Sequence, residues 1–203
     1  RALGNAALSV SISTLSTVGA MFLTPLNVTF WGSLDPSMNA LLRSFSLDPL
    51  HMLFDLSLIL GLPLAAGMFI AHRYEAFAKK VHGPMRNFSL LVLIGFVVAA
   101  LVLNWSFFLQ YGRFVVVVVF VHNALALASG YWLARMAGLA ERDCRAVAFE
   151  TGIQNSGLGL VLVFNFFGGL GGMAIVAAWW GIWHIVVGTS LAAWWRRHPP
   201  MPL

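Results

Sequence analysis

Charged side chains are scarce in this sequence. Only 12 Lys and Arg and 7 Asp and Glu occur among 203 residues, so that 9% of the chain is charged, against about 25% in soluble globular domains. Hydrophobic residues make up 60% of it, and the mean hydropathy is +0.84. No fold in water needs so much apolar surface. The composition therefore argues against a soluble enzyme or binding domain and predicts a protein whose main partner is the lipid bilayer.

Cysteine is also nearly absent. Cys144 stands alone, which excludes an intrachain disulfide and a cysteine metal cluster and leaves packing as its expected role. The sequence opens with Arg1, without an initiator methionine or the pattern of a signal peptide. We therefore expect the chain to be a fragment of a longer protein.

Six hydrophobic segments are each long enough to cross a bilayer core of about 30 Å as a helix. They are residues 5–31, 50–71, 88–107, 114–137, 146–167 and 173–195. The fifth reaches full length only if its start extends back toward Glu141. A glycine-rich stretch, residues 168–172, reads as a tight turn between the last two segments. We predict an all-α polytopic membrane protein with a single membrane domain.

The basic residues predict how the chain is oriented in the membrane. The net charge of +5 might suggest a nucleic-acid partner, but Lys and Arg fall in the connections between segments, where they act as orientation signals. All but Arg43 and Arg113 fall on one side, which we expect to be cytoplasmic together with both chain ends. Four tryptophans near segment ends are expected to anchor at the membrane surface: Trp31, Trp105, Trp194 and Trp195.

The fifth segment carries the chemistry. Residues 150–157 read Glu-Thr-Gly-Ile-Gln-Asn-Ser-Gly, a polar run with two glycines inside an apolar helix. A carboxylate at the bilayer centre costs at least about 2.5–3.5 kcal/mol and is rarely left there without a role. If the helix breaks between Gly152 and Gly157, oxygens of residues 150–154 can enclose a hard cation, as in transporters with interrupted spans.

A break of this kind brings together helix ends of opposite partial charge. The first half-helix would present its negative C-terminal end to a cation, and the second its positive N-terminal end to an anion. The alternative is structural: Glu150 is protonated or paired, and the glycines only allow close helix packing. The intramembrane carboxylate and its polar neighbours favour the cation site.

These residues resemble a known family. The run 150–157, with the charged stretch 141–145 before it, is similar to the broken ninth helix of the bile acid:sodium symporter family. The opening Gly-Asn-Ala-Ala-Leu-Ser-Val, residues 4–10, with Ser13 and Thr17 after it, is similar to the fifth helix. The resemblance covers the whole chain as helices five to ten of a ten-helix inverted-repeat transporter. It implies a C-terminal fragment of a prokaryotic member, in the bacterial inner membrane, that carries an organic anion with sodium.

The resemblance also implies a two-sodium site. One sodium would bind the side chains of Ser9, Ser13 and Glu150. The other would bind Glu150, Gln154 and the carbonyl groups of Thr151 and Ile153. Asn155 would face the substrate, a bile-acid-like or small carboxylate. Residues 1–31 and 111–198 would form core-type helices, and residues 48–107 panel-type helices.

Two departures from the family pattern matter. The first four helices, with the partner broken helix and its sodium ligands, are absent from this sequence. In the sixth segment similar members have His-Asn where this chain has His184-Ile185, which predicts the loss of one polar substrate contact. His184 remains a candidate substrate-binding residue, with a hydrogen bond to a neighbouring helix as the alternative.

Other polar residues have simpler interpretations. Ser9 and Ser13 lie four apart on one helical face and could bond to carbonyls one turn back instead of a ligand. His122 and Asn123 could line the site, but packing between helices is the preferred interpretation.

Three other function classes fit this pattern less well. An intramembrane enzyme lacks a nucleophile beside a base and a pair of histidines at metal-binding spacing, so we predict no enzyme. A cation channel would need polar rings from several subunits. A proton-coupled carrier, with a proton on Glu150 in place of sodium, is the nearest alternative.

Overall fold

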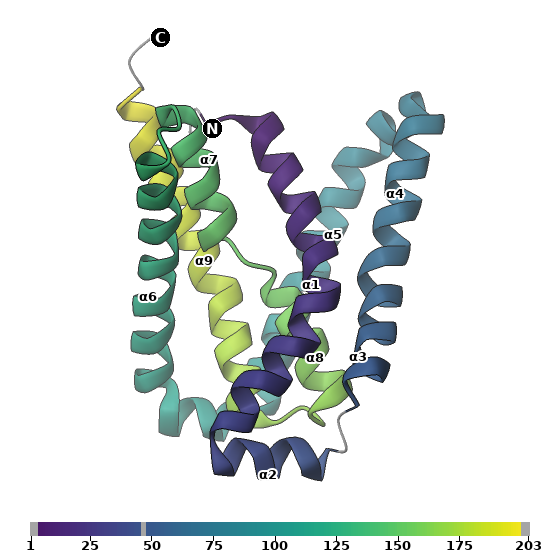
Figure 1. Cartoon of the computed structure of the whole chain (residues 1–203), viewed down its shortest axis with the longest axis vertical. Helices are drawn as coiled ribbons and strands as arrows, with labels where there is room; N and C mark the ends of the chain where they lie inside the picture. The colour runs from purple at the N-terminus through teal and green to yellow at the C-terminus, as the bar shows by residue number, and fades with distance from the viewer. Residues whose placement is uncertain (1–3, 46–47, 200–203) are drawn as a thin grey trace. The chain divides into compact units, whose positions relative to one another are not determined.

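The computed structural model describes residues 4–45 and 48–199, and these residues contain helices and no strand. Six helical segments are long and apolar enough to cross a membrane. They are Ala6–Leu34, Pro49–Arg73, Glu75–Leu103, Trp105–Met136, Glu141–Phe166 and Gly171–Arg197 (Figure 1). The prediction of an all-α, multi-pass membrane protein with six spans is confirmed.

Some spans begin or end at other residues than the sequence predicted. The fifth span does start at Glu141, as its length required. The third and fourth spans meet at Asn104, whereas the predicted segments left residues 108–113 between them. These residues remain in α6 (Trp105–Met136), where the helix satisfies their backbone groups without water. Asn104 marks the end of α5 (Glu75–Leu103) and donates its amide Nδ2–H to the Ala100 carbonyl, 2.9 Å away.

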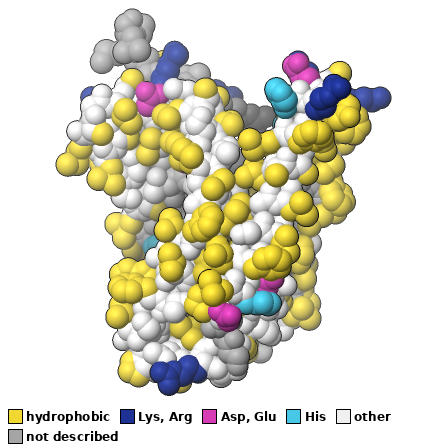
Figure 2. Space-filling view, turned by 45° about the vertical axis from the view of Figure 1, so that its right-hand side comes forward, with side chains coloured by type: hydrophobic (Ala, Val, Ile, Leu, Met, Phe, Trp, Pro, Cys, Tyr) yellow, Lys and Arg dark blue, Asp and Glu magenta, His cyan; other side chains and the backbone are white. Residues whose placement is uncertain are grey.

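The described residues divide into two compact units, one within residues 14–92 and the other formed by residues 4–13 with 93–199. The first holds most of α1 (Ala6–Leu34), the short α2 (Pro36–Ser44) capped by Asp35, and one span in three parts. That span consists of α3 (Pro49–Leu56), a π-helical turn (Ser57–Gly61) and α4 (Leu62–Arg73). Figure 2 shows yellow hydrophobic side chains along the helices and dark blue Lys and Arg at their ends, as lipid requires.

The second unit contains α6, α7 (Glu141–Gly152), α8 (Ser156–Phe166) and α9 (Gly171–Arg197). Helix α6 packs against α7 and α9, and α8 packs against α9. Small residues allow the close approach: the buried face of α9 includes Ala174, Ala178, Gly181 and Gly188. Between α8 and α9, Gly168 and Gly169 adopt positive φ angles of 58° and 73°, which glycine tolerates best. The predicted tight turn is thereby confirmed.

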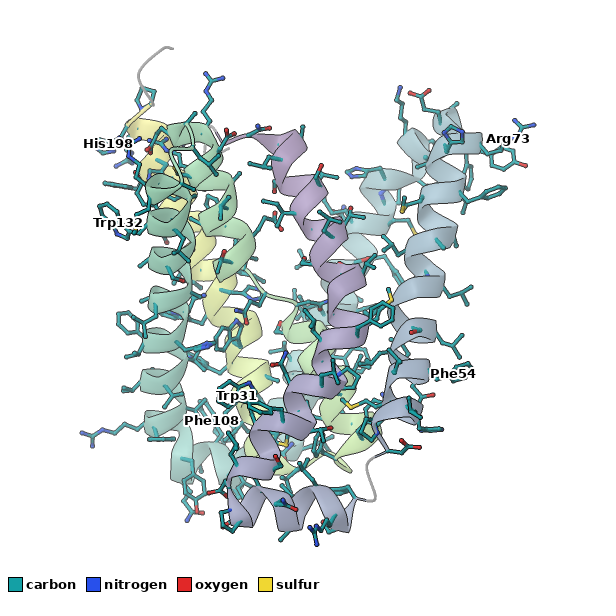
Figure 3. The ribbon with its side chains drawn as sticks, viewed as in Figure 1. Trp31, Phe54, Arg73, Phe108, Trp132 and His198 are labelled. Carbon is teal, nitrogen blue, oxygen red and sulfur yellow. The ribbon has the colours of Figure 1, made fainter. Side chains whose placement is uncertain are left out.

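The tryptophans at the span ends divide into two kinds. Trp31, Trp105 and Trp194 are exposed, as a membrane-surface anchor must be, and Figure 3 shows Trp31 projecting from α1. Trp195 is only 7% exposed and packs against Ala148, Phe149 and Tyr131. The expectation of an anchor at Trp195 is therefore wrong, because this ring is part of the packing between α6, α7 and α9.

Candidate functional site

The fifth span is interrupted where the polar run predicted. Helix α7 ends at Gly152 and α8 begins at Ser156, so that residues 153–155 are not helical. The Ile153 N–H still bonds to the Phe149 carbonyl at 2.8 Å, and Asn155 Oδ1 accepts the Leu158 N–H at 2.8 Å. Asn155 is thus the N-cap of α8, a position that favours asparagine. Gly157 lies inside the first turn of α8, so the break is shorter than the span between the two glycines.

Glu150 lies in the last turn of α7, and two hydroxyls hold it. Ser9 Oγ donates to Glu150 Oε1, and Ser13 Oγ donates to Glu150 Oε2. The two serines are one helical turn apart on α1, so one face of that helix reaches both carboxylate oxygens. The structure therefore brings Ser9, Ser13 and Glu150 together, although they are separated by more than 130 residues of sequence.

The start of α1 is fixed on α7 by a second contact. Asn5 donates its amide Nδ2–H to Asp143 Oδ1 at 2.8 Å, and the Asn5 N–H bonds to the Arg142 carbonyl at 3.1 Å. Asn5 Oδ1 also accepts the Leu8 N–H at 3.1 Å, which caps the helix. These bonds set the register of α1 on α7, and with it the height at which Ser9 and Ser13 meet Glu150.

Thr151, Ile153 and Gln154 surround the break. The Thr151 hydroxyl donates to the Val147 carbonyl at 2.8 Å. The backbone carbonyl is therefore the polar group of Thr151 that is available at the break. That carbonyl accepts the Gln154 Nε2–H at 3.2 Å. Ile153 and Gln154 are exposed. The structure thus places an amide and a carbonyl in contact, one turn from the Glu150 carboxylate.

His184 lies on the buried face of α9 and is only 6% exposed. It stands between Gly181 and Gly188, one turn from each. A Cβ at Gly181 would contact Ser156, and one at Gly188 would contact Ile153 and Phe149, so this stretch of α9 packs along the break. Among the described residues, no partner is found for His184 Nδ1. A cavity of about 380 Å³ is lined by His184, Ile153, Gly188 and Thr189, among others.

Asn123, which the sequence offered as a possible site residue but more readily as a packing residue, lies at the break. It is buried on α6 and donates its Nδ2–H to the Gly152 carbonyl at 2.7 Å. A carbonyl at the end of an interrupted helix lacks its partner from the next turn, and Asn123 supplies one. Packing between helices, the preferred interpretation, is part of its role, but the helix end it binds is the break itself. The signal was a polar side chain within an apolar span.

A second cluster, Tyr131, Glu141, Arg145, Trp195 and His198, fixes the other end of α7. The Arg145 side chain is 5% exposed and bonds through Nε to Glu141 Oε1 at 2.8 Å. Its Nη1–H and Nη2–H donate to the carbonyls of Trp195 and His198 at 3.2 and 2.9 Å, which caps the C-terminus of α9. Tyr131 donates its hydroxyl to Glu141 Oε2 at 2.8 Å. The start of α7 is thereby bound to both α6 and α9.

We expect Arg145→Gln to destabilise the protein by ~3 kcal/mol, because it removes the cation paired with Glu141 and the donor to two helix-terminal carbonyls. Arg142→Gln is the matched control, since that side chain is exposed on the same helix. Thermal unfolding in one detergent measures both. Equal melting temperatures for the two variants would show that the cluster contributes no stability.

The sequence compares closely with one family of membrane proteins. Residues 1–197 match the SBF-like CPA transporter family. The chain belongs to this family. The resemblance to bile acid:sodium symporters, noted on residues 4–17 and 141–157, is thereby confirmed.

Relatives within this family carry names of transporters. The chain is 28% identical to the uncharacterized sodium-dependent transporter YocS of Bacillus subtilis (strain 168) over 96% of its length and 57% of that protein. It is 30% identical to the probable chloroplastic sodium/metabolite cotransporter BASS1 of Arabidopsis thaliana, over 98% of the chain and 47% of that protein. With the human ileal sodium/bile acid cotransporter it shares 30% identity over 76% of the chain and 43% of the relative. The chain thus spans about half the length of these relatives.

Proposed function

We propose that this chain carries the sodium-binding half of a symporter that moves an organic anion by alternating access. The observation that supports this most strongly is the Glu150 carboxylate, placed at the end of an interrupted membrane helix and held by the hydroxyls of Ser9 and Ser13. A structural carboxylate needs no break in its helix. A cation site that uses backbone carbonyls beside the carboxylate does, because the break exposes them as ligands.

In this proposal the first sodium binds Glu150, the side-chain oxygen of Gln154 and the carbonyls of Thr151 and Ile153. The Gln154 amide now donates to the Thr151 carbonyl. Sodium would replace that N–H on the carbonyl, and the Gln154 side chain would turn its oxygen toward the ion. Oxygen ligands of this kind suit hard cations. The ion neutralises Glu150 and orders residues 153–155.

The second sodium binds Ser9, Ser13 and Glu150. Each hydroxyl now donates its proton to the carboxylate, so that its oxygen lone pairs point elsewhere. Those lone pairs and the carboxylate can share one ion. Two sodium ions carried with a monoanion move one net positive charge, which gains about 2.3 kcal/mol per 100 mV of inward potential. Transport at this stoichiometry is electrogenic.

The substrate docks beside Asn155, at the start of α8. The positive N-terminal end of that helix favours an anion, and Asn155 stands at its first turn. His184, which faces the break from α9, supplies the second polar contact. Its neighbour Ile185 offers no hydrogen bond, so the site is less polar there than in relatives with His-Asn. The substrate class is a bile-acid-like or small carboxylate; among the relatives, one is named a sodium/bile acid cotransporter and another a sodium/metabolite cotransporter.

The remainder of the proposal concerns the setting of the site. Residues 1–31 and 111–198 form core-type helices that move against panel-type helices in residues 48–107. Further N-terminal helices of the same protein complete the cation sites. The protein lies in a bacterial inner membrane with both ends of this chain in the cytoplasm, as the distribution of Lys and Arg favours.

Uptake into vesicles tests the proposal directly. The protein at its full natural length is supplied with a panel of labelled organic anions in sodium or choline at fixed pH. We expect saturable uptake of at least one anion in sodium and none above background in choline. Uptake in choline that follows a pH gradient would replace the proposal by proton coupling. Fast, non-saturable sodium flux without an anion would indicate a channel.

A further inference from the structure

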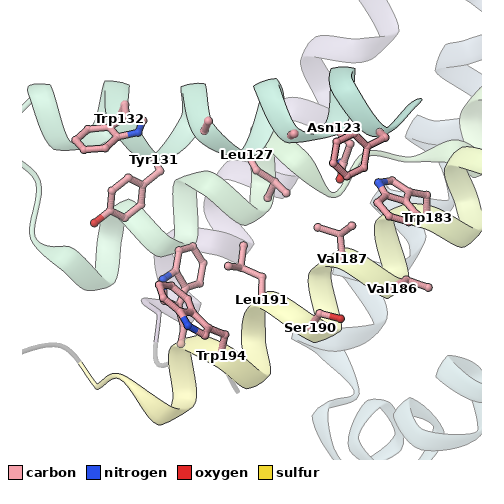
Figure 4. A pocket seen from close by; sticks show the side chains of 14 residues that line it. Asn123, Leu127, Tyr131, Trp132, Trp183, Val186, Val187, Ser190, Leu191 and Trp194 are labelled. Carbon is pink, nitrogen blue, oxygen red and sulfur yellow. The ribbon is translucent and has the colours of Figure 1, made fainter. Parts of the chain in front are cut away.

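An apolar groove runs along α6 and α9 on one face of the second unit, and its uncharged end reaches Asn123 beside the helix break. Its volume is about 690 Å³ (Figure 4). Six of its lining residues show its character: Leu127, Tyr131, Trp132, Val187, Leu191 and Trp194. Trp132 and Trp194 remain 61% and 54% exposed. Apart from Asn123, which holds the Gly152 carbonyl, none of the residues that line the groove has a role in the proposed transport cycle.

The length of the groove matches one leaflet of a bilayer. Its walls run from Phe120 to Trp132 on α6 and from Trp183 to Trp195 on α9. At 1.5 Å per residue each wall is about 18 Å long. Half of a hydrocarbon core of about 30 Å is about 15 Å. An extended acyl chain from one leaflet therefore has room along the whole groove.

One end of the groove is strongly basic. Arg135 lies one turn beyond Tyr131 and Trp132, and Arg197 lies one turn beyond Trp194, so the two lining faces continue into two exposed arginines. Figure 3 shows Trp132 and His198 at this same end of α6 and α9. Residues 131–145 and 190–199 hold five arginines and only two carboxylates.

Both carboxylates at this end are already engaged. Glu141 bonds to Tyr131 and Arg145, and Asp143 bonds to Asn5. Glu141 also interacts electrostatically with Arg135, but it is shared with the buried Arg145, so positive charge at this end still exceeds negative charge. At the opposite end the groove is lined by Phe120, Asn123 and Trp183, with no charge. The groove therefore favours an amphipathic ligand bound in one orientation. Its anionic head would lie at the arginines and its apolar tail along the helices.

We propose that the α6–α9 groove is a binding site for an anionic phospholipid. The acyl chain lies against Leu127, Val187 and Leu191, and the phosphate meets Arg135 and Arg197, whose planar guanidinium groups suit phosphate oxygens. Basic sites between membrane helices bind such head groups. A protein helix packed in the groove would cover Trp132 and Trp194 but would leave these two arginines without an anion.

Tryptophan fluorescence tests this site, because four of the eight tryptophans of the chain line the groove. The protein is placed in phosphatidylcholine vesicles with a small fraction of lipid brominated on its acyl chain, either phosphatidylglycerol or phosphatidylcholine. We expect the phosphatidylglycerol to quench at about tenfold lower mole fraction. Equal quenching by the two lipids would overturn the proposal, and so would a groove shielded from both by another helix or a second copy.

Substitutions of the two arginines test whether they cause the preference for phosphatidylglycerol. The double variant Arg135→Gln, Arg197→Gln should lose the tenfold preference, whereas Arg135→Lys, Arg197→Lys should keep most of it. Both side chains are exposed, so neither change disturbs the packing. Arg73→Gln, at the end of α4 in the other unit, is the control and should leave the preference unchanged. A preference that survives the double glutamine variant would place the lipid elsewhere and overturn the proposal.

Discussion

Replacing Glu150 by Gln should lower the apparent affinity for sodium by at least about 100-fold, or ~2.7 kcal/mol. The change removes the charge that balances the cation and keeps the shape of the side chain. One serine can still donate to the remaining carbonyl oxygen and the other can accept from the new amide N–H, so the contact between α1 and α7 survives in part. The measurement is the sodium concentration that gives half-maximal uptake, with the amount of folded protein matched by size-exclusion chromatography.

Glu75→Gln is the matched control for this experiment. Glu75 is exposed at the start of α5 and pairs with Lys79 at 2.5 Å, a contact that contributes little in water. We expect uptake by this variant to equal that of the wild type. Equal sodium dependence in Glu150→Gln and Glu75→Gln would mean that Glu150 is a structural residue and that the ion binds elsewhere.

Gly130→Ala should cost about 1–3 kcal/mol of stability, the range for an overpacked core. A Cβ at Gly130 would lie 2.5 Å from Thr151 Oγ1, 2.8 Å from Thr151 Cβ and 3.1 Å from the Val147 carbonyl oxygen. Helices α6 and α7 must then separate at the level of the break. The Asn123 bond to the Gly152 carbonyl, also between α6 and α7, should weaken with it. Thermal unfolding reports the loss, and sodium-dependent uptake should fall in parallel.

Two further variants test whether close packing of Gly130 against Thr151 causes the loss of stability. Gly95→Ala on α5 meets nothing within 4 Å and should be neutral or stabilising, because alanine favours helix over glycine by up to about 1 kcal/mol. Thr151→Ala removes the nearest clashing atom and should restore part of the stability when combined with Gly130→Ala. If both glycine variants lose the same stability, close packing at Gly130 is not the reason.

The sequence predicts the fold well because lipid limits the choices. A chain with 60% hydrophobic residues and six apolar segments must form helices, since a helix satisfies its own backbone hydrogen bonds. Helix ends were less predictable. Residues 108–113 contain Gln, Gly and Arg and look like a loop in water, yet they continue α6 from Trp105. Their polar side chains lie near the end of the helix, where polar groups are tolerated.

The candidate site was predictable only where the chemistry is unusual. Glu150 and the glycines after it break an apolar pattern, and the family motif adds Ser9 and Ser13. Asn123, which binds the Gly152 carbonyl at the break, lies 29 residues before it, and Arg145, at the other end of α7, binds the Trp195 carbonyl 50 residues later. No local pattern links Asn123 to Gly152 or Arg145 to the end of α9, because these pairs depend on how helices pack. The same limit hid the α6–α9 groove, whose two walls lie about 60 residues apart.

Equilibrium binding of radioactive sodium to the purified protein at its full natural length tests the cation site without the need for a substrate. The ion is displaced with unlabelled sodium, potassium or choline at constant ionic strength, for the wild type and for Glu150→Gln. We predict saturable binding that sodium displaces and choline does not, and no saturable binding to the variant. Saturable binding of equal affinity in both proteins, or none in the wild type, would contradict a sodium site at the break in the fifth span.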